Sequence, residues 1–147
     1  MGRLLHVYWR VSRGLTVGVR AAVIDAADRV FLIRHTYTPG WHLPGGGLEA
    51  GESAVEALRR ELFEEARLAW TEPPRLHGIF FNTQVSNRDH VLIYVVRAFS
   101  VIEPKRPDRE IAEAGFFPLD ALPTGTTGAT RRRLGEIGAG HAPAETW

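Results

Sequence analysis

The sequence predicts an α+β fold in which a mixed β-sheet packs against helices. Several short segments alternate apolar and polar residues, the period of β-strands, whereas two segments repeat their apolar residues with the period of an α-helix. These segments follow one another in the order strands, helix, strands, helix. The chain has 147 residues and no internal repeat or linker, so we expect residues 1–147 to form one domain.

The N-terminal part predicts an arm followed by two strands. Residues 3–12 have apolar side chains whose spacing fits either a short helix or a strand, and we treat residues 1–14 as an N-terminal arm. Residues 15–25 alternate as a strand does, and residues 30–34 form a second apolar run. Turn-forming residues separate these two runs, which predicts a β-hairpin.

A glycine- and proline-rich segment and a helix come next. Residues 39–47 contain two prolines and four glycines, which predicts an irregular loop. The clearest helix of the sequence covers residues 53–69, where Ser53 and Glu56 have the spacing of a capping box. Its apolar residues fall on one side, so we expect the helix to pack against the sheet.

The rest of the chain predicts three strands, a helix and a tail. Residues 76–82, 91–99 and 114–117 are rich in β-branched and aromatic side chains, which favour strands. Residues 129–137 predict a final helix whose arginines face solvent, and residues 138–147 predict a flexible tail.

The composition excludes several classes of protein. Lys and Arg number 18 and Asp and Glu number 17, so the charge balance gives no indication of polymeric nucleic acid as a partner. The absence of cysteine excludes disulfides, thiolate nucleophiles and cysteine-based zinc sites. No long apolar segment and no signal peptide is present, so we expect no membrane partner and a cytoplasmic location.

Three acidic residues of the predicted helix form the candidate chemical centre. Glu61, Glu64 and Glu65 stand at positions i, i+3 and i+4, which places their carboxylates on one side of the helix. Carboxylates at this density repel one another unless a cation lies between them, and their hard oxygen atoms suit Mg²⁺ or Mn²⁺. The alternative is a solvated acidic face that Arg59 and Arg60 partly neutralise.

These glutamates belong to a longer set of residues at fixed spacing. The set consists of Gly46, Glu52, Arg60, Glu61, Leu62, Glu64, Glu65 and Leu68. Its spacing resembles the Nudix box, the signature of the Nudix hydrolase family, and departs from it only at Arg67, where the family has glycine. The flanking segments 41–46 and 115–122 also resemble this family. The resemblance implies an α/β/α sandwich, in which a mixed sheet lies between helices.

The resemblance also assigns roles to residues of the motif. Glu61, Glu64 and Glu65 would bind Mg²⁺, for which Mn²⁺ is a possible substitute, and the Gly46 carbonyl would add a further oxygen ligand. Glu52 and Arg60 would form a structural ion pair that fixes the loop against the helix. Arg67 would either adopt a left-handed conformation or let the helix continue for a few residues.

The implied reaction is the attack of a metal-activated water on one phosphorus of a P–O–P bridge. Glu110, in the polar segment before the last strand, resembles the loop glutamate that some family members use as a general base, and an exposed loop carboxylate is the alternative. Glu64 and Glu65 are the competing candidates for this base. We count Glu61, Glu64, Glu65 and Glu110 as candidate catalytic residues.

Candidate substrate contacts surround the glycine-rich segment. Arg20 lies within the first strand, where its guanidinium would either reach a phosphate or bridge a carboxylate. Arg34 and His42 flank the glycines and would contact phosphate, or simply lie on the surface. Gly45 and Gly46 would let the backbone approach the substrate and the metal.

Three functions are consistent with these residues. The first is hydrolysis of a nucleoside-diphosphate-X compound, such as a nucleotide sugar or ADP-ribose, as a small-molecule substrate. The second is a nucleoside-triphosphate pyrophosphatase, and the third is a nucleotide-sensing module without turnover. The intact trio of glutamates favours the two enzymes over the sensor. The predicted oligomeric state is a monomer or a homodimer, with the apolar N-terminal arm as a candidate self-association surface.

Overall fold

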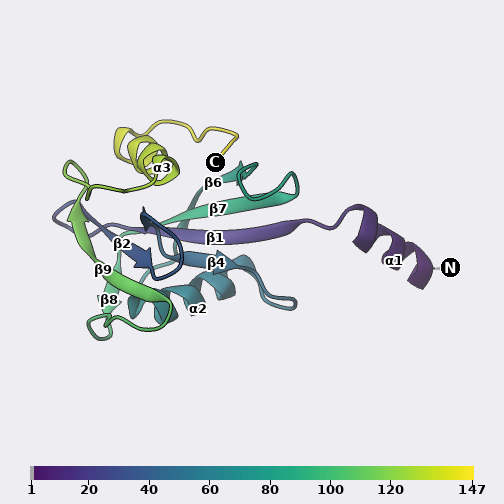
Figure 1. The fold of residues 1–147 in the computed structure, drawn as a ribbon, viewed down its shortest axis with the longest axis horizontal. Coiled ribbons are helices and arrows are strands. Elements are labelled where there is room, and N and C mark those ends of the chain that lie inside the picture. Colours follow the sequence, from purple (N-terminus) through teal and green to yellow (C-terminus); the bar gives the residue numbers. More distant parts are fainter. Residues whose placement is uncertain (1) are drawn as a thin grey trace.

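Strand β1 (Thr16–Val23) lies at the centre of the fold (Figure 1), which the computed structural model describes for residues 2–147. It pairs in parallel with β7 (Asp89–Val96) and antiparallel with β4 (Gly45–Gly47). Strand β6 (Arg75–Phe81) pairs with the other edge of β7, which gives a mixed sheet of order β4-β1-β7-β6. The predicted mixed sheet is therefore confirmed.

Two smaller sheets extend this arrangement. Strand β2 (Arg29–His35) pairs antiparallel with β3 (Trp41–His42) and with β9 (Ile111–Pro118). Strand β5 (Leu68–Trp70) pairs with β8 (Phe99–Val101).

The predicted hairpin between the first two strands is wrong. One isolated bridge joins Ile24, the residue after β1, to Val30 of β2, and the two strands belong to different sheets. The partner that β1 takes instead is β7, which is far away in the sequence. A parallel partner of this kind cannot be connected by a tight turn, so local alternation does not reveal it.

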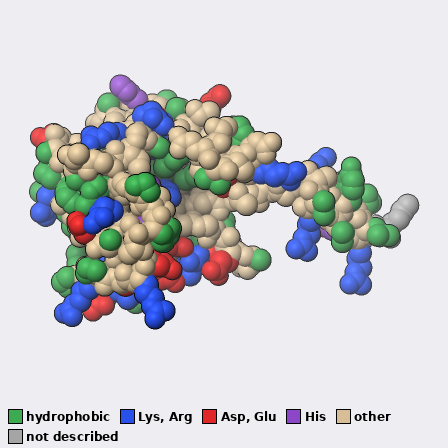
Figure 2. All heavy atoms as spheres, in the orientation of Figure 1, with side chains coloured by type: hydrophobic (Ala, Val, Ile, Leu, Met, Phe, Trp, Pro, Cys, Tyr) green, Lys and Arg blue, Asp and Glu red, His purple; other side chains and the backbone are tan. Residues whose placement is uncertain are grey.

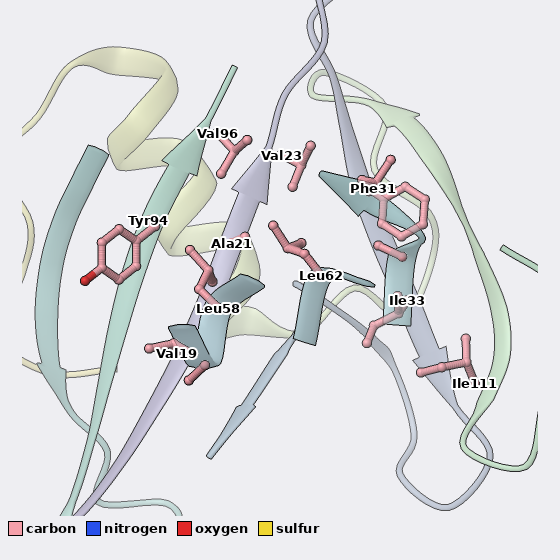
Figure 3. Close-up of a cluster of buried hydrophobic side chains, with 13 residues drawn as sticks. Val19, Ala21, Val23, Phe31, Ile33, Leu58, Leu62, Tyr94, Val96 and Ile111 are labelled. Carbon is pink, nitrogen blue, oxygen red and sulfur yellow. The ribbon is translucent and has the colours of Figure 1, made fainter. Parts of the chain in front are cut away.

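Helices cover both faces of the sheets and make the fold an α/β/α sandwich. Helix α2 (Ala54–Ala66) packs on one face, where Leu58 and Leu62 meet Val19, Ala21 and Val23 (Figure 3). Helix α3 (Gly128–Ala139) lies across the other face. There Leu134 belongs to a second cluster with members that include Ala22, Ile24, Leu32 and Phe80. Both faces of β1 are therefore buried in its second half, where its small apolar residues contribute to two cores.

Helix α2 begins as predicted and ends earlier than predicted. The Ser53 side chain accepts from the Glu56 backbone N–H, and the Glu56 side chain accepts from the Ser53 backbone N–H, which completes a capping box. The helix ends at Ala66 instead of Ala69 because Arg67 adopts a left-handed conformation, with φ 54° and ψ 39°. Its backbone N–H bonds to the carbonyls of the last turn, as a C-terminal glycine usually does.

The glycine-rich segment is not an irregular loop throughout, contrary to the prediction. It contains the short strands β3 and β4, and Gly45, Gly46 and Gly47 lie opposite Arg20, Val19 and Gly18 of β1. A Cβ on Gly45 would overlap the Val19 carbonyl oxygen, and φ at Gly45 is +154°. Glycine is needed here for the close approach of two backbones, and the segment is regular because it pairs with β1.

The N-terminal arm, for which the sequence left helix and strand open, is a helix. Helix α1 (Gly2–Ser12) projects from the body along the long axis of the molecule, and none of its residues is buried (Figure 1). Within residues 2–147, no helix has both the length and the apolarity that crossing a bilayer requires.

The residues expected to form a flexible tail make specific contacts. The Phe81 backbone N–H donates to the Glu145 carbonyl, and the Trp147 N–H donates to the Phe81 carbonyl. The Trp147 ring packs on Phe80, with ring centroids 6.0 Å apart. Arg133, which the sequence placed on a solvated helix surface, is 1% exposed and donates to the Thr146 carbonyl. The guanidinium is buried because this C-terminal segment covers it.

We predict that the left-handed conformation of Arg67 reduces stability. The variants Arg67→Gly and Arg67→Ala both remove the contacts of the side chain with Phe63 and Glu103. Only alanine keeps a Cβ, so Arg67→Gly should be more stable than Arg67→Ala by about 1 kcal/mol. Denaturant unfolding of both variants measures this difference. An alanine variant as stable as the glycine variant would mean that no strain is stored at this position.

Candidate active site

Two carboxylates of helix α2 are buried at the edge of the apolar core. Only 9% of Glu61 and 6% of Glu65 is exposed. They stand about one helical turn apart and both face strand β4, whose glycines contact them. The fold therefore brings two of the three predicted glutamates against the glycine strand.

Glu61 lies directly against Gly46. A Cβ on Gly46 would come within 2.7 Å of the Glu61 Cδ, so no other residue fits at this point without displacing the carboxylate. The Oε1 atom of Glu61 accepts a hydrogen bond of 2.8 Å from Arg60 Nη1. Burial raises the pKa of Glu61, the nearby charge of Glu65 raises it further, and the bond to Arg60 opposes the shift. A cation beside Glu61 would relieve this unfavourable burial of charge.

Glu65 is held by groups from two different sheets. Its Oε2 atom accepts a 2.9 Å hydrogen bond from the Gly45 backbone N–H of β4. Its Oε1 atom lies 3.3 Å from His35 Nε2, at the end of β2. These contacts fix the carboxylate at the point where β4 and β2 approach α2.

Glu64, the third predicted glutamate, is in a different environment. Its side chain is 56% exposed, and its Oε2 atom lies 3.6 Å from Arg60 Nη1. The trio therefore consists of two buried carboxylates with defined partners and one carboxylate that is free to reorient into solvent.

Arg60 and Glu52 form an ion pair that joins α2 to the loop before it. Arg60 Nη2 lies 2.7 Å from Glu52 Oε1, and the same nitrogen donates to the Gly47 carbonyl at 3.2 Å. The bond to Glu52 raises the pKa of Arg60 above its usual range, and the bond from Arg60 lowers the pKa of Glu52. Arg60 thus holds the loop, the glycine strand and Glu61 in one position.

Arg20 extends from β1 toward the same region. Its Nη1 atom donates a 2.7 Å hydrogen bond to the Leu43 carbonyl. Burial lowers the pKa of Arg20, and the charges of Glu65 and Glu61 oppose this shift. The charges of both carboxylates therefore act on the guanidinium, although the hydrogen bond that it donates goes to a backbone carbonyl.

Arg34 and His42, two further candidates for phosphate contact, lie in different surroundings. Arg34 forms an ion pair with Glu113 across the β2–β9 pairing, and both side chains are largely exposed. His42 Nε2 lies 3.0 Å from the Pro39 carbonyl oxygen, and its ring is 5.7 Å from the His35 ring. Burial lowers the pKa of His42. Of the two, only His42 is brought near the residues that hold Glu65.

Glu110 lies on an exposed loop before β9 and touches none of the glutamates of α2 through a resolved bond. Its carbonyl accepts from the Thr36 backbone N–H at 2.8 Å, which attaches the loop to the end of β2. The pKa of Tyr37 is raised by burial and then by the charges of Glu110 and Glu65. Glu110 and Glu65 are therefore both close enough to Tyr37 for their charges to act on it.

A cavity of about 500 Å³ adjoins the glycine strand. Its lining includes the first residues of β1, Gly46 and Gly47, and the cluster of Thr16, Asn82 and Asp89. In that cluster, Asp89 accepts from the Thr16 hydroxyl at 2.6 Å and from the Asn82 amide at 3.0 Å. Gly46 lies against Glu61 and also borders this cavity, which is large enough for a nucleoside and whose lining includes none of the three glutamates of α2.

A family profile described as the NUDIX domain matches residues 14–135, which is most of the chain. The chain belongs to the Nudix family. The resemblance stated from the motif is therefore confirmed.

Three known proteins illustrate the similarity. The 8-oxo-dGDP phosphatase NUDT18 of Mus musculus is 30% identical over 135 residues, which cover 88% of this chain and 41% of that protein. The ADP-ribose pyrophosphatase of Methanocaldococcus jannaschii is 35% identical over 106 residues, covering 69% of this chain and 61% of that protein. The crystal structure of a MutT NUDIX hydrolase from Burkholderia pseudomallei aligns with a TM-score of 0.67 at 32% identity, covering 83% of this chain and 97% of that one. The chain spans about two fifths of the length of the curated relatives that it matches first.

The Nudix carboxylates fit a divalent cation in their chemistry. Nudix enzymes use a divalent metal ion, and the oxygen atoms of Glu61 and Glu65 are the hard donors that Mg²⁺ and Mn²⁺ prefer. Among residues 2–147, no three acidic or imidazole side chains already converge on one point. The three glutamates face different surroundings. The Glu61 carboxylate contacts Arg60, and the Glu65 carboxylate contacts Gly45 and His35. The Glu64 carboxylate faces solvent.

Sequence reasoning missed three polar residues of this Nudix site. His35 was not singled out, although its position just after the second apolar run and shortly before the glycine-rich segment is a usable signal. Thr16 and Asp89 were not identified because their contact depends on the parallel pairing of β1 and β7, in which they lie opposite each other. No local pattern indicates that pairing.

We predict that Glu61→Gln stabilises the metal-free protein. Glutamine keeps an oxygen that accepts from Arg60 and removes a buried negative charge beside Glu65, so the free energy of unfolding in EDTA should rise by roughly 0.5 kcal/mol. Glu64→Gln, at an exposed position of the same helix, should leave that free energy unchanged. A marked loss of stability in Glu61→Gln would show that the carboxylate is instead satisfied by its protein partners.

Proposed function

We propose that this Nudix protein hydrolyses a diphosphate linkage in a nucleoside-diphosphate-X compound, such as a nucleotide sugar or ADP-ribose, with Mg²⁺ or Mn²⁺. One observation carries the proposal: Glu61 and Glu65 are buried against strand β4, and Gly46 of that strand, which lies against Glu61, also borders a cavity of about 500 Å³. A diphosphate bound between the cavity and the carboxylates would lie where one cation neutralises the charges of the phosphates and of the carboxylates. We assign Glu61, Glu64 and Glu65 as ligands of that cation, with the Gly46 carbonyl as a further oxygen.

The residues around the glutamates have distinct tasks in this proposal. When bound, the cation supplies positive charge that stabilises the phosphate oxygens and lowers the pKa of an attacking water. Arg60 keeps Glu61 oriented, and the Gly45 N–H keeps Glu65 oriented. Glu110, and Glu64 where it does not bind the cation, are the candidates to accept the proton of the water, because both are exposed. Arg20 is close enough to balance the charge of the carboxylates.

The substrate class is supported by the cavity and by the relatives. Apolar residues at the start of β1 offer surface to a base, while Asp89 and Asn82 offer hydrogen-bonding groups to a base or sugar. Two relatives have names that refer to compounds of a nucleoside diphosphate, 8-oxo-dGDP and ADP-ribose. A Bacillus subtilis relative named as a putative 8-oxo-dGTP diphosphatase supports a nucleoside-triphosphate pyrophosphatase as the second candidate.

Product identification tests the proposed class directly. The protein is incubated with Mg²⁺ or Mn²⁺ and a panel of nucleotide sugars, ADP-ribose, nucleoside diphosphates and nucleoside triphosphates. Two monophosphates released from a nucleotide sugar or from ADP-ribose are the expected result. Release of pyrophosphate from triphosphates alone would establish the second candidate, and no turnover across the panel would leave only a sensing role.

We predict that Glu64 is needed for turnover and not for folding. Glu64→Gln should keep the stability of the native protein and lower kcat by about 10²–10⁴-fold, the range expected for loss of a ligand or general base. Glu113→Gln is the matched control, because Glu113 has the same side-chain exposure of 56% and also faces an arginine. Its kcat should stay close to that of the native protein. Equal rates in the two variants would remove Glu64 from the site.

We predict that Glu110 and Glu64 can be separated by the pH dependence of kcat. If Glu110 accepts the proton, Glu110→Gln should abolish the acidic limb of the pH–rate profile and lower kcat by about 10²-fold or more. An unchanged profile and kcat in Glu110→Gln would assign the base to the glutamates of α2. The pH–rate profile and kcat are both measured at a saturating concentration of the metal ion, so that a change in metal affinity does not affect the measured rates.

A further inference from the structure

Helix α1 exposes a continuous apolar surface away from the body of the protein. Its large apolar side chains are between 45% and 79% exposed, and they are Leu4, Leu5, Val7, Tyr8, Trp9 and Val11. Figure 2 shows the helix standing clear of the body, with hydrophobic and basic side chains on its surface and no acidic ones. Nothing in residues 2–147 covers this face.

The helix is amphipathic, with a basic polar face. At about 100° per residue, the six apolar side chains cover an arc of about 200°. Arg3, His6 and Arg10 fall within about 60° on the opposite side. The first acidic residue of the chain is Asp25, so no carboxylate offsets the charges of Arg3 and Arg10 within the helix. The apolar and the cationic faces are therefore separated along the whole length of α1.

Such a helix needs an apolar partner to be stable. An isolated helix of 11 residues is marginal in water, because nucleation is costly and packing supplies most helical stability. The junction to the body is polar: Arg88 Nη1 donates to the Gly14 carbonyl at 2.9 Å, and the Arg13 guanidinium lies 5.8 Å from the centre of the Trp9 ring. These contacts anchor the C-terminal end of the helix, and its apolar face remains exposed to solvent.

We propose that α1 docks the protein on an anionic lipid surface, with the apolar face inserted at the interface and the basic face directed to lipid phosphates. A short helix with a large apolar face, a basic polar face and an interfacial tryptophan has the composition of such anchors. Trp9 lies at the boundary between the apolar and basic arcs, where an amphipathic ring meets both lipid and water. The proposal concerns a peripheral contact and does not depend on the hydrolase reaction.

A second copy of the chain fits the helix less well. The helix is about 16 Å long, and pairing two such faces buries much less than the roughly 800 Å² per partner of a standard interface. It would also leave the cationic face without a partner. The sequence-based expectation of no membrane partner rested on the absence of a spanning segment, which a helix lying on the surface does not need.

Cosedimentation with lipid vesicles tests this proposal on the full chain. Vesicles of phosphatidylcholine alone are compared with vesicles of equal parts phosphatidylcholine and phosphatidylglycerol. The protein should bind the anionic vesicles, bind the neutral ones much more weakly, and dissociate as salt is raised. Replacing both Arg3 and Arg10 by Ser should lower the partition coefficient on anionic vesicles by roughly thirtyfold, about 1 kcal/mol for each arginine.

A matched pair of variants shows whether the apolar face is responsible. Val7→Glu places a charge on the apolar face, at its border with the basic side chains, and should lower binding by about tenfold or more. Val101→Glu is the control, since Val101 on β8 is 54% exposed against 59% for Val7, and it should bind as the native protein does. Both variants should keep their thermal stability.

Three results would overturn the proposal. The first is the absence of binding to either vesicle, and the second is native-like binding by Val7→Glu. The third is a native dimer in sedimentation velocity that Val7→Glu dissociates, without vesicle binding, which would assign the face to a second copy of the chain.

Discussion

The close approach of strand β4 to helix α2 is the constraint on which the rest of the site depends. Two glycines make it possible, because side chains at Gly45 or Gly46 would overlap the backbone of β1 or the carboxylate of Glu61. The approach buries Glu61 and Glu65 and gives Glu65 a backbone N–H as partner. Buried carboxylates are costly unless they are paired, so this geometry favours a cation at the site. The Nudix motif can be understood as the set of residues that makes this approach possible.

Several local devices fix the helix that carries the carboxylates. The capping box of Ser53 and Glu56 sets where α2 begins, and the left-handed Arg67 sets where it ends. Between them, the ion pair of Arg60 with Glu52 and the bond from Arg60 to the Gly47 carbonyl hold the loop and the glycine strand against the helix. The arginine at the usual glycine position has kept the glycine backbone conformation, so the departure from the family pattern changes local strain and leaves the direction of the chain unchanged.

The sequence predicted the features that depend on neighbouring residues and failed for those that depend on distant partners. The capping box, the apolar face of α2 and the three glutamates were readable because their spacing is local. The parallel pairing of β1 with β7, and with it the contact between Thr16 and Asp89, depends on segments far apart in the chain. Arg133 was misread because its partners, Trp147 and Thr146, come from a segment whose glycines and prolines suggested a tail. The different environments of Glu64 and Glu65 arise from packing against β4 and His35, which helical spacing alone cannot reveal.

The central claim is that Glu61 and Glu65 bind a divalent cation at the glycine strand. Electron paramagnetic resonance of Mn²⁺ titrated into the full chain, with a nucleoside diphosphate present, measures this directly. We expect stoichiometric loss of the free-ion signal for the native protein, and little loss for a variant that combines Glu61→Gln with Glu65→Gln. An undiminished free-ion signal with the native protein, or equal uptake by the variant, would contradict it.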